Sequence, residues 1–257
     1  MSELIAIQRI TRQELDVQIA TAKAYPRDIA TFSKRAVSLA TTDQDTAESC
    51  IYALPRRNKQ GKQDFLKGPS IRLAEIITYA WGNIHSAARI VENNGRTIDV
   101  EAVVWDLETN NKATKPLRKS IVGKDGNPYS QDMQTMTANA AIAICWRNAV
   151  FSIIPKPVFN PVYIAALNYA IGDQTKLQSK IVALFDRFQK MGIDKEKILE
   201  YFQHANAAEI TVDEVEEMIG IGTAIKEKSL LIDDAFKIEV EKNQKTNLLN
   251  DKLSGEN

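Results

Sequence analysis

Lysines and arginines gather in two short segments of the chain. Residues 56–72 hold six basic residues and a single acid, Asp64, whereas residues 112–124 hold five basic residues and no acid. The basic residues of the two segments are Arg56, Arg57, Lys59, Lys62, Lys67, Arg72, Lys112, Lys115, Arg118, Lys119 and Lys124. Cations spaced along turns and strands can bind the evenly spaced phosphates of a nucleic-acid strand. The alternative is that both segments are solvated loops that keep the protein soluble.

Aromatic side chains close to these segments could stack on bases. Tyr52, Phe65 and Tyr129 lie in or beside them, and stacking contributes roughly 1–3 kcal/mol per base with little sequence preference. Each of the three could equally be an ordinary core residue. The tryptophans lie on elements with an apolar pattern and are expected in the core: Trp81, Trp105 and Trp146.

Arg147 lies within an otherwise apolar stretch of a predicted helix. A buried arginine needs an anionic partner, because an unpaired charge is costly away from water. That partner could be a phosphate of DNA, or the carboxylate of Asp106 or Glu108. We include Arg147 among the candidate DNA-binding residues.

Signals for catalysis are weak. The chain has no GxxxxGK[ST], GxGxxG or GxSxG motif, so neither a nucleotide-driven motor nor a serine hydrolase is indicated. Four acids on one predicted hairpin could form the metal site of a nuclease; they are Asp99, Glu101, Asp106 and Glu108. We favour a protein that is not an enzyme and keep the nuclease as the less favoured alternative.

No cofactor or structural metal is expected. Cys50 and Cys145 lie far apart in apolar surroundings, and His85 and His204 are isolated. Without a CxxC or a cysteine–histidine cluster, the cysteines are predicted to be reduced thiols of the core.

The hydrophobic pattern predicts an α+β fold. The order is two or three helices, a hairpin, a helix, a three-stranded antiparallel meander and a long helix, followed by a small helical module. Asn94-Gly95 is a strong hairpin signal, and Thr211 with Glu214 forms a plausible capping box. The predicted elements are helices 1–24, 28–40 and 43–48, strands 51–54 and 64–67, a helix capped by Ser70, strands 84–92, 97–107 and 112–122, helices 131–152 and 162–171, and helical segments from 175 onward.

Charge is divided unevenly along the chain. Residues 1–160 carry 21 lysines and arginines against 16 acids, whereas residues 161–257 carry 12 against 17, so a net charge of zero hides two different halves. Three parts are expected: a DNA-binding core over 1–172, to which the resemblance described below adds oligomerisation, a helical module over 173–229 and a polar tail over 230–257. Hydrophobic residues make up 44% and charged residues 26%, as in ordinary globular proteins.

Five segments of the chain are distinctive. They read SCIYALPR (49–56), GPSIRLAE (68–75), WGN (81–83), VWDLETN (104–110) and RNAVFSIIP (147–155). These segments resemble phage proteins of the RecT, Red-beta and Erf superfamily of single-strand annealing proteins. The resemblance covers about residues 45–165, and the order hairpin, helix, meander, long helix is similar to the core of that superfamily. No single DNA contact can be transferred from it, so the candidate residues rest on charge alone.

The resemblance implies ATP-independent binding of single-stranded DNA and annealing of complementary strands during phage recombination and repair, on a ring or helical homo-oligomer. For the acidic C-terminal module it implies a partner such as a host single-strand binding protein or an exonuclease, or else only a packing role. The alternatives are a protein that coats single-stranded DNA without annealing it, and a structural phage protein. No apolar run approaches the ~20 residues that span a bilayer, so we expect a location in the bacterial host cytoplasm.

Overall fold

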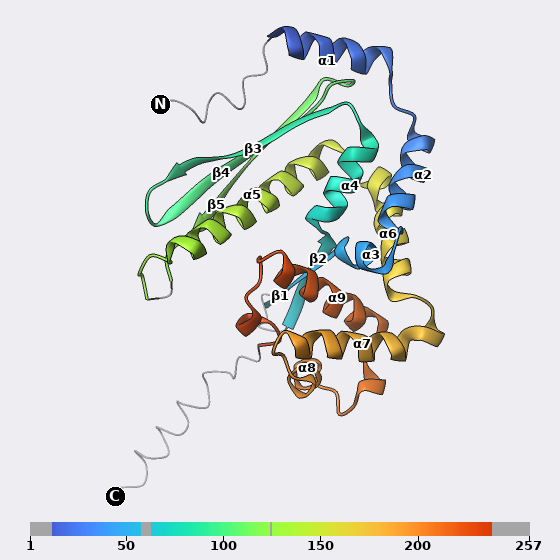
Figure 1. Ribbon diagram of the computed structural model, residues 1–257, viewed down its shortest axis with the longest axis vertical. Coiled ribbons are helices and arrows are strands. Elements are labelled where there is room, and N and C mark those ends of the chain that lie inside the picture. Colours follow the sequence, from blue (N-terminus) through green and yellow to red (C-terminus); the bar gives the residue numbers. More distant parts are fainter. Residues whose placement is uncertain (1–11, 58–62, 124, 238–257) are drawn as a thin grey trace, which may run out of the picture.

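A computed structural model describes residues 12–57, 63–123 and 125–237. The fold is α+β, as the sequence predicted (Figure 1). In order, its elements are α1 (Arg12–Ala24), α2 (Ile29–Ala40), α3 (Gln44–Ser49), β1 (Ile51–Arg57), β2 (Gln63–Pro69), α4 (Ile71–Trp81), β3 (Ile84–Asn93), β4 (Thr97–Asp106), β5 (Asn111–Ser120), α5 (Gln131–Ile153), α6 (Lys156–Ile171), α7 (Leu177–Lys190), α8 (Lys195–Phe202) and α9 (Val212–Lys226). None of these helices is both long and apolar enough to cross a bilayer.

Polar residues fix the starts of several helices. The side chains of Asp28, Asp43, Ser70 and Ser130 each accept a hydrogen bond from a backbone N–H of the first turn that follows. Such caps satisfy donors that have no partner inside the helix. The capping box predicted at the start of α9 is also confirmed.

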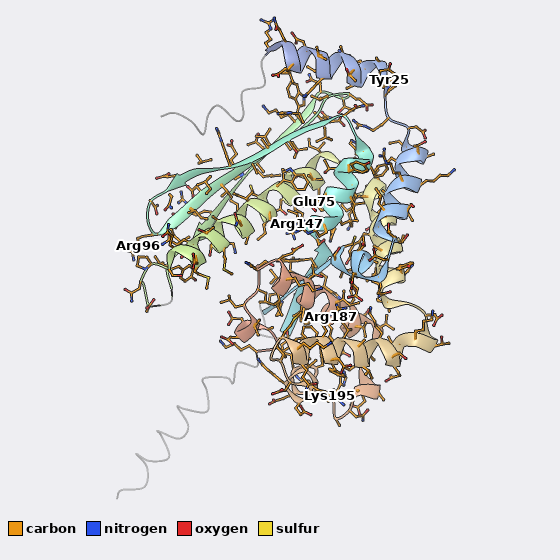
Figure 2. The ribbon with its side chains drawn as sticks, viewed as in Figure 1. Tyr25, Glu75, Arg96, Arg147, Arg187 and Lys195 are labelled. Carbon is orange, nitrogen blue, oxygen red and sulfur yellow. The ribbon has the colours of Figure 1, made fainter. Side chains whose placement is uncertain are left out.

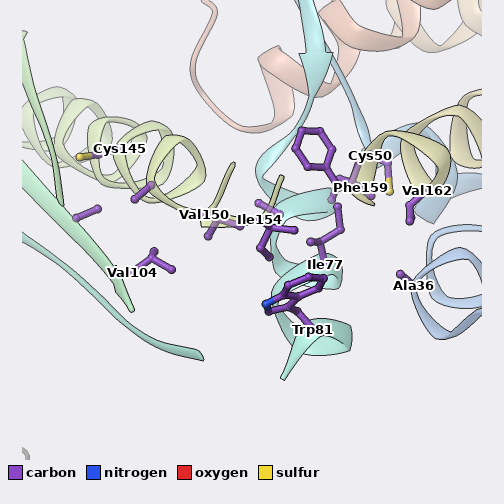
Figure 3. Close-up of a cluster of buried hydrophobic side chains, with 14 of the residues drawn as sticks. Ala36, Cys50, Ile77, Trp81, Val104, Cys145, Val150, Ile154, Phe159 and Val162 are labelled. Carbon is purple, nitrogen blue, oxygen red and sulfur yellow. The ribbon is translucent and has the colours of Figure 1, made fainter. Parts of the chain in front are cut away.

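The three-stranded meander is covered on one face by the long helix. Its strand order is β3-β4-β5, all antiparallel, and α5 runs beneath β4 and β5 (Figure 1). Side chains of β4 alternate between buried and half-buried, which is the period-2 pattern of a sheet with one covered face. Val104 and Cys145 lie on facing sides of this core (Figure 3).

The hairpin β1-β2 forms a separate sheet and packs against the C-terminal helices. Its closest neighbour is α9, where a Cβ added to Gly220 would lie 2.5 Å from the backbone nitrogen of Ala53. The second hydrophobic cluster therefore joins Ile51 to residues of α7, α8 and α9, such as Phe188 and Ile219. This packing crosses residue 172, where the sequence suggested that the core ends.

Two details of the predicted elements were wrong. The prolines were expected to separate α5 from a helix over 162–171, but α6 begins at Lys156 with Pro157 in its first turn and Pro161 inside. A proline in the first turn removes an N–H that would have no intrahelical acceptor, so it fits there. The expected tail also starts later than 230, because Ala235 and Phe236 are buried in the second cluster.

Candidate nucleic-acid interface

Two arginines of the first basic segment are paired with carboxylates. An Nη atom of Arg56 on β1 lies 2.7 Å from Asp64 Oδ2 on the opposite strand. Arg72, in the first turn of α4, lies 2.8 Å from Glu75 Oε2, one turn further along. Both pairs are exposed and contribute little to stability. The carboxylates nevertheless neutralise part of the positive charge of this basic segment.

Lys67 on β2 is paired across the fold. Its Nζ lies 3.1 Å from Glu217 Oε1 and 3.4 Å from Glu216 Oε2, both on α9. Burial opposes the charge on Lys67, but these carboxylates outweigh it and raise the pKa of the lysine. Acids of the C-terminal module thus lie against a cation of the hairpin.

The second basic segment is divided between two faces of the sheet. Successive side chains of a strand point to opposite faces of the sheet. Lys112 and Arg118 therefore lie on the face away from α5, where they pair in register with Trp105 and Asp99 of β4. Lys115 and Lys119 lie on the face that α5 covers. Arg118 Nη2 lies 2.6 Å from Asp99 Oδ2, and hydrogen bonding from Arg118 lowers the pKa of Asp99.

The two basic segments lie on separate sheets. A carboxylate pairs with each of four of their residues, namely Arg56, Lys67, Arg72 and Arg118. Four other candidates fall on parts for which no side chain is described: Arg57, Lys59, Lys62 and Lys124.

Arg147 lies between α5 and the hairpin (Figure 2). Its guanidinium carbon is 4.8 Å from the centre of the Tyr52 ring, and it lines a small cavity with Ala140, Ala143 and Ile144 of the same helix. Arg147 is half-buried there.

Neither carboxylate that the sequence offered to Arg147 is its partner. Asp106 and Glu108 both bind Arg27, whose Nη2 donates to Asp106 Oδ1 at 2.7 Å and whose Nε lies 3.0 Å from Glu108 Oε1. Arg27 also stacks on Trp81 at 4.3 Å. Sequence analysis missed Arg27, since nothing in a sequence signals a pair 79 residues apart.

Lys115, Lys119 and Arg147 form what we call the α5 cation set. Lys115 and Lys119 project from the covered face of β5, and Cys145 of α5 hydrogen-bonds to the backbone oxygen of Lys115 at 3.0 Å. Arg147 lies on the opposite side of the same helix, next to the hairpin. Within the described residues, no ion pair within 4.0 Å involves a member of the set, although Glu227 lines the same small cavity as Arg147 and interacts with its charge. Lys112 likewise has no carboxylate within 4.0 Å among these residues, and its ammonium lies 5.8 Å from the centre of the Trp105 ring.

The aromatic residues considered for base stacking pack mostly in the hydrophobic core. Tyr52 is only 3% exposed, Phe65 packs against Tyr201 and Phe202, and Tyr129 is half-buried against the first cluster. Of the tryptophans, Trp81 is buried as predicted and Trp146 is half-buried against the core.

Trp105 departs from its prediction as a core residue. It faces away from α5, with its Nε1 donating to Asn110 at 3.1 Å and the Lys112 ammonium 5.8 Å from its ring. Its position in the period-2 pattern of β4, out of step with buried Val104, was the signal that could have shown this.

The four acids considered for a nuclease site are dispersed. Asp99 binds Arg118, Glu101 lies 3.3 Å from Arg89, and Asp106 and Glu108 bind Arg27. Burial opposes ionisation of Asp106, but the hydrogen bond from Arg27 outweighs it and holds the pKa below its ordinary value. No group of three metal-ligating side chains is found within the described ranges.

The cysteines are buried and unbonded, as predicted. Burial raises the pKa of the Cys50 thiol to about 12, so this thiol is unreactive at neutral pH.

Sequence analysis also missed one buried and one half-buried carboxylate. Glu48 of α3 is held by Lys180 and Arg187 of α7, and Glu227 lies at the end of α9 beside Arg147. Both depend on contacts between distant elements, for which the residue types alone give no signal.

Comparison of this chain with protein-family models, with curated proteins and with solved structures found no match in any of the three.

Proposed function

We propose that this protein binds single-stranded DNA without ATP and anneals complementary strands, as in the superfamily that its sequence segments resemble. The observation that carries the proposal is the α5 cation set, in which three cations from β5 and α5 border one helix without a carboxylate partner among the described residues. The order of hairpin, helix, meander and long helix also agrees with the order that the resemblance implies.

An unpaired cation can exchange its small counterions for phosphates, and the released ions favour binding. A cation already paired with a carboxylate gains less, because the phosphate must first displace that carboxylate. The α5 cation set is therefore the best candidate in the described chain for holding a sugar-phosphate backbone. Annealing then needs no cofactor, because base pairing itself drives the reaction once the repulsion between two phosphate chains has been reduced.

The proposal extends to an assembly. Side-by-side subunits in a ring or helical filament would place one α5 cation set after another along a DNA strand. The acidic C-terminal module, roughly 173–229, would bind a partner such as a host single-strand binding protein or an exonuclease. Its negative charge repels DNA, so it is not expected to bind the strand itself.

The test is to mix two complementary labelled strands and to follow duplex formation with and without the protein, in the absence of ATP. We expect faster annealing that requires complementarity, with a non-complementary strand as the control. Binding of the strands without faster annealing would show that the protein coats single-stranded DNA but does not anneal it. No binding at low salt would overturn the proposal, and magnesium-dependent cleavage of the strands would point to a nuclease.

A further inference from the structure

The face of the three-stranded sheet away from α5 carries a trough. Strand register sets the side chains of this face in rows that cross β3, β4 and β5, and one row consists of the short side chains of Ala87, Val103 and Thr114. The rows on either side hold longer side chains, so the short row forms the floor of a depression. Its volume is about 320 Å³, which lies within the roughly 300–1,000 Å³ of pockets that hold small ligands.

The two rims of the trough differ in chemistry. One rim is the pair of Arg89 on β3 and Glu101 on β4, whose charged groups lie 3.3 Å apart. The other rim is Lys112 of β5, whose register neighbour on β4 is Trp105. The Lys112 ammonium lies 5.8 Å from the centre of the Trp105 ring. One end of the trough therefore combines an aromatic ring with a cation that has no carboxylate partner in the described part of the chain.

The trough lies open at one edge of the sheet. Helix α5 packs on the opposite face (Figure 1), and all the described residues that line the trough come from the three strands. Strand β5 is the last in the order β3-β4-β5. A strand of DNA that crosses this edge can therefore reach Lys112 on one face and Lys115 on the other.

A nucleotide matches this arrangement in each of its parts. The flat face of its base can lie on the side chain of Val103 and stack beside the ring of Trp105. Its phosphate is an anion, for which Lys112 is the available cation. The edge of the base carries donors and acceptors that the exposed hydroxyl group of Thr114 can meet. A purely apolar ligand would leave Lys112 without a partner, and a string of anions would meet the carboxylate of Glu101.

We propose that the trough binds one nucleotide of single-stranded DNA, with its base against Val103 beside Trp105 and its phosphate at Lys112. The inference rests on the proposed function and adds to it a site for a base, on the face opposite to the one that bears Lys115 and Lys119. Stacking tolerates any base, so the site suits a protein that must bind strands of any sequence. The contact involves no covalent step.

Tryptophan fluorescence of the full chain, titrated with oligothymidylate, tests where the base lies. A base stacked beside Trp105 should quench its emission, whereas Trp81 is buried and Trp146 is half-buried against the core. We therefore expect most of the quenching to be lost in Trp105→Phe, which keeps an aromatic ring. The strand should also quench at concentrations at which thymidine monophosphate does not. Equal quenching by the monophosphate would assign the trough to free nucleotides and overturn the proposal.

Filling the trough tests its shape. The double variant Ala87→Leu with Thr114→Leu places larger side chains on the floor. Thr97→Leu, on the same face but outside the trough, is the control. Binding of fluorescein-labelled oligothymidylate, measured by anisotropy, should weaken about tenfold in the filled variant, as expected for the loss of one stacked base, and should not change in the control.

Removing the cation gives a second test, which also decides the matter if the filled variant does not fold. Lys112→Gln should flatten the slope of log K against log salt by about 0.7, as for one lost phosphate contact on a single strand. Arg118→Gln removes the same charge from the same strand and face, but Arg118 is bound to Asp99, so its slope should change little.

The inference is overturned if the wild type binds oligothymidylate but Trp105→Phe keeps the quenching, or if a folded variant with a filled trough binds as tightly as the wild type. Equal slopes for Lys112→Gln and Arg118→Gln would also overturn it. Absence of binding by the wild type at low salt would instead overturn the proposed function.

Discussion

Glu48 is the residue on which the attachment of α7 to the amino-terminal half depends. It is only 4% exposed, and its two carboxylate oxygens bind Lys180 and Arg187, while Gln44 also donates to it at 3.0 Å. Burial opposes ionisation of Glu48, but these hydrogen bonds outweigh it and keep the pKa below its ordinary value. The charged form is therefore part of the folded state.

Replacing Glu48 with glutamine should lower the free energy of unfolding at neutral pH by about 2–3 kcal/mol, because two partly buried cations lose their counter-charge. The measurement is urea denaturation followed by circular dichroism, with Glu200→Gln as the control.

The effect of Glu48→Gln should depend on pH in a definite direction. A carboxylate whose pKa is lowered in the folded state contributes stability that is fully present above its ordinary pKa of 4.5. That contribution is lost as the pH falls through the lowered pKa of the folded state. The difference between wild type and variant should therefore shrink on acidification from pH 7 to pH 3. A difference that stays constant would show that the ion pairs do not hold α7.

At the scale of elements, the position of the hairpin depends on close approach between β1 and α9. Gly220 makes that approach possible, since an added Cβ would meet the backbone nitrogen and the Cβ of Ala53 at 2.5 Å. Helix α9 and the strand that carries Tyr52 would have to move apart to make room. Because Tyr52 supports Arg147, this contact also fixes one member of the α5 cation set.

Gly220→Ala should destabilise the protein by about 1–3 kcal/mol, because the clash is with backbone and cannot be relieved by a side-chain rotation. Gly222→Ala on the same helix is the matched control, since its added Cβ would lie 3.8 Å from Phe188 Cζ, an ordinary contact. There we expect no loss, or a gain of up to about 1 kcal/mol from higher helix propensity. Equal thermal stability of the two variants would contradict the described packing.

Elements were predictable from the sequence where local signals act alone. The period of apolar residues and the Asn94-Gly95 turn predicted the meander and the helices between residues 28 and 153 to within a few residues. Thr211 and Glu214 predicted the capping box of α9. The proline-rich segment was misjudged because proline breaks a helix in its interior but fits its first turn. Pro157 lies in that turn.

The candidate site was less predictable, because charge in a sequence does not show which carboxylates fold against it. Arg56 and Arg118 each face an acid on a neighbouring strand, and Lys67 meets acids some 150 residues away in sequence. Strand alternation could have separated Lys112 from Lys115 beforehand, since neighbours at odd spacing point to opposite faces. The stacking of Arg147 on Tyr52 could not have been inferred, because it depends on where α5 meets the hairpin.

At the scale of the whole molecule, overall charge is balanced, with 33 basic and 33 acidic residues. Long-range attraction by net charge is therefore weak, and DNA binding must depend on local groups. Among the candidate cations, four are paired with carboxylates and three form the α5 cation set. Two variants that each remove three charges, one from each group, therefore have the same net charge and test the proposal directly.

The most direct measurement is the salt dependence of oligothymidylate binding for two triple variants of equal charge. One replaces the α5 cation set by glutamine (Lys115, Lys119 and Arg147), and the other replaces three paired cations (Arg56, Lys67 and Arg118). The slope of log K against log salt should flatten by about 2 in the first variant, since each lost phosphate contact on a single strand removes about 0.7, and should change little in the second. Equal flattening in both variants, or an unchanged slope in the first, would contradict the account.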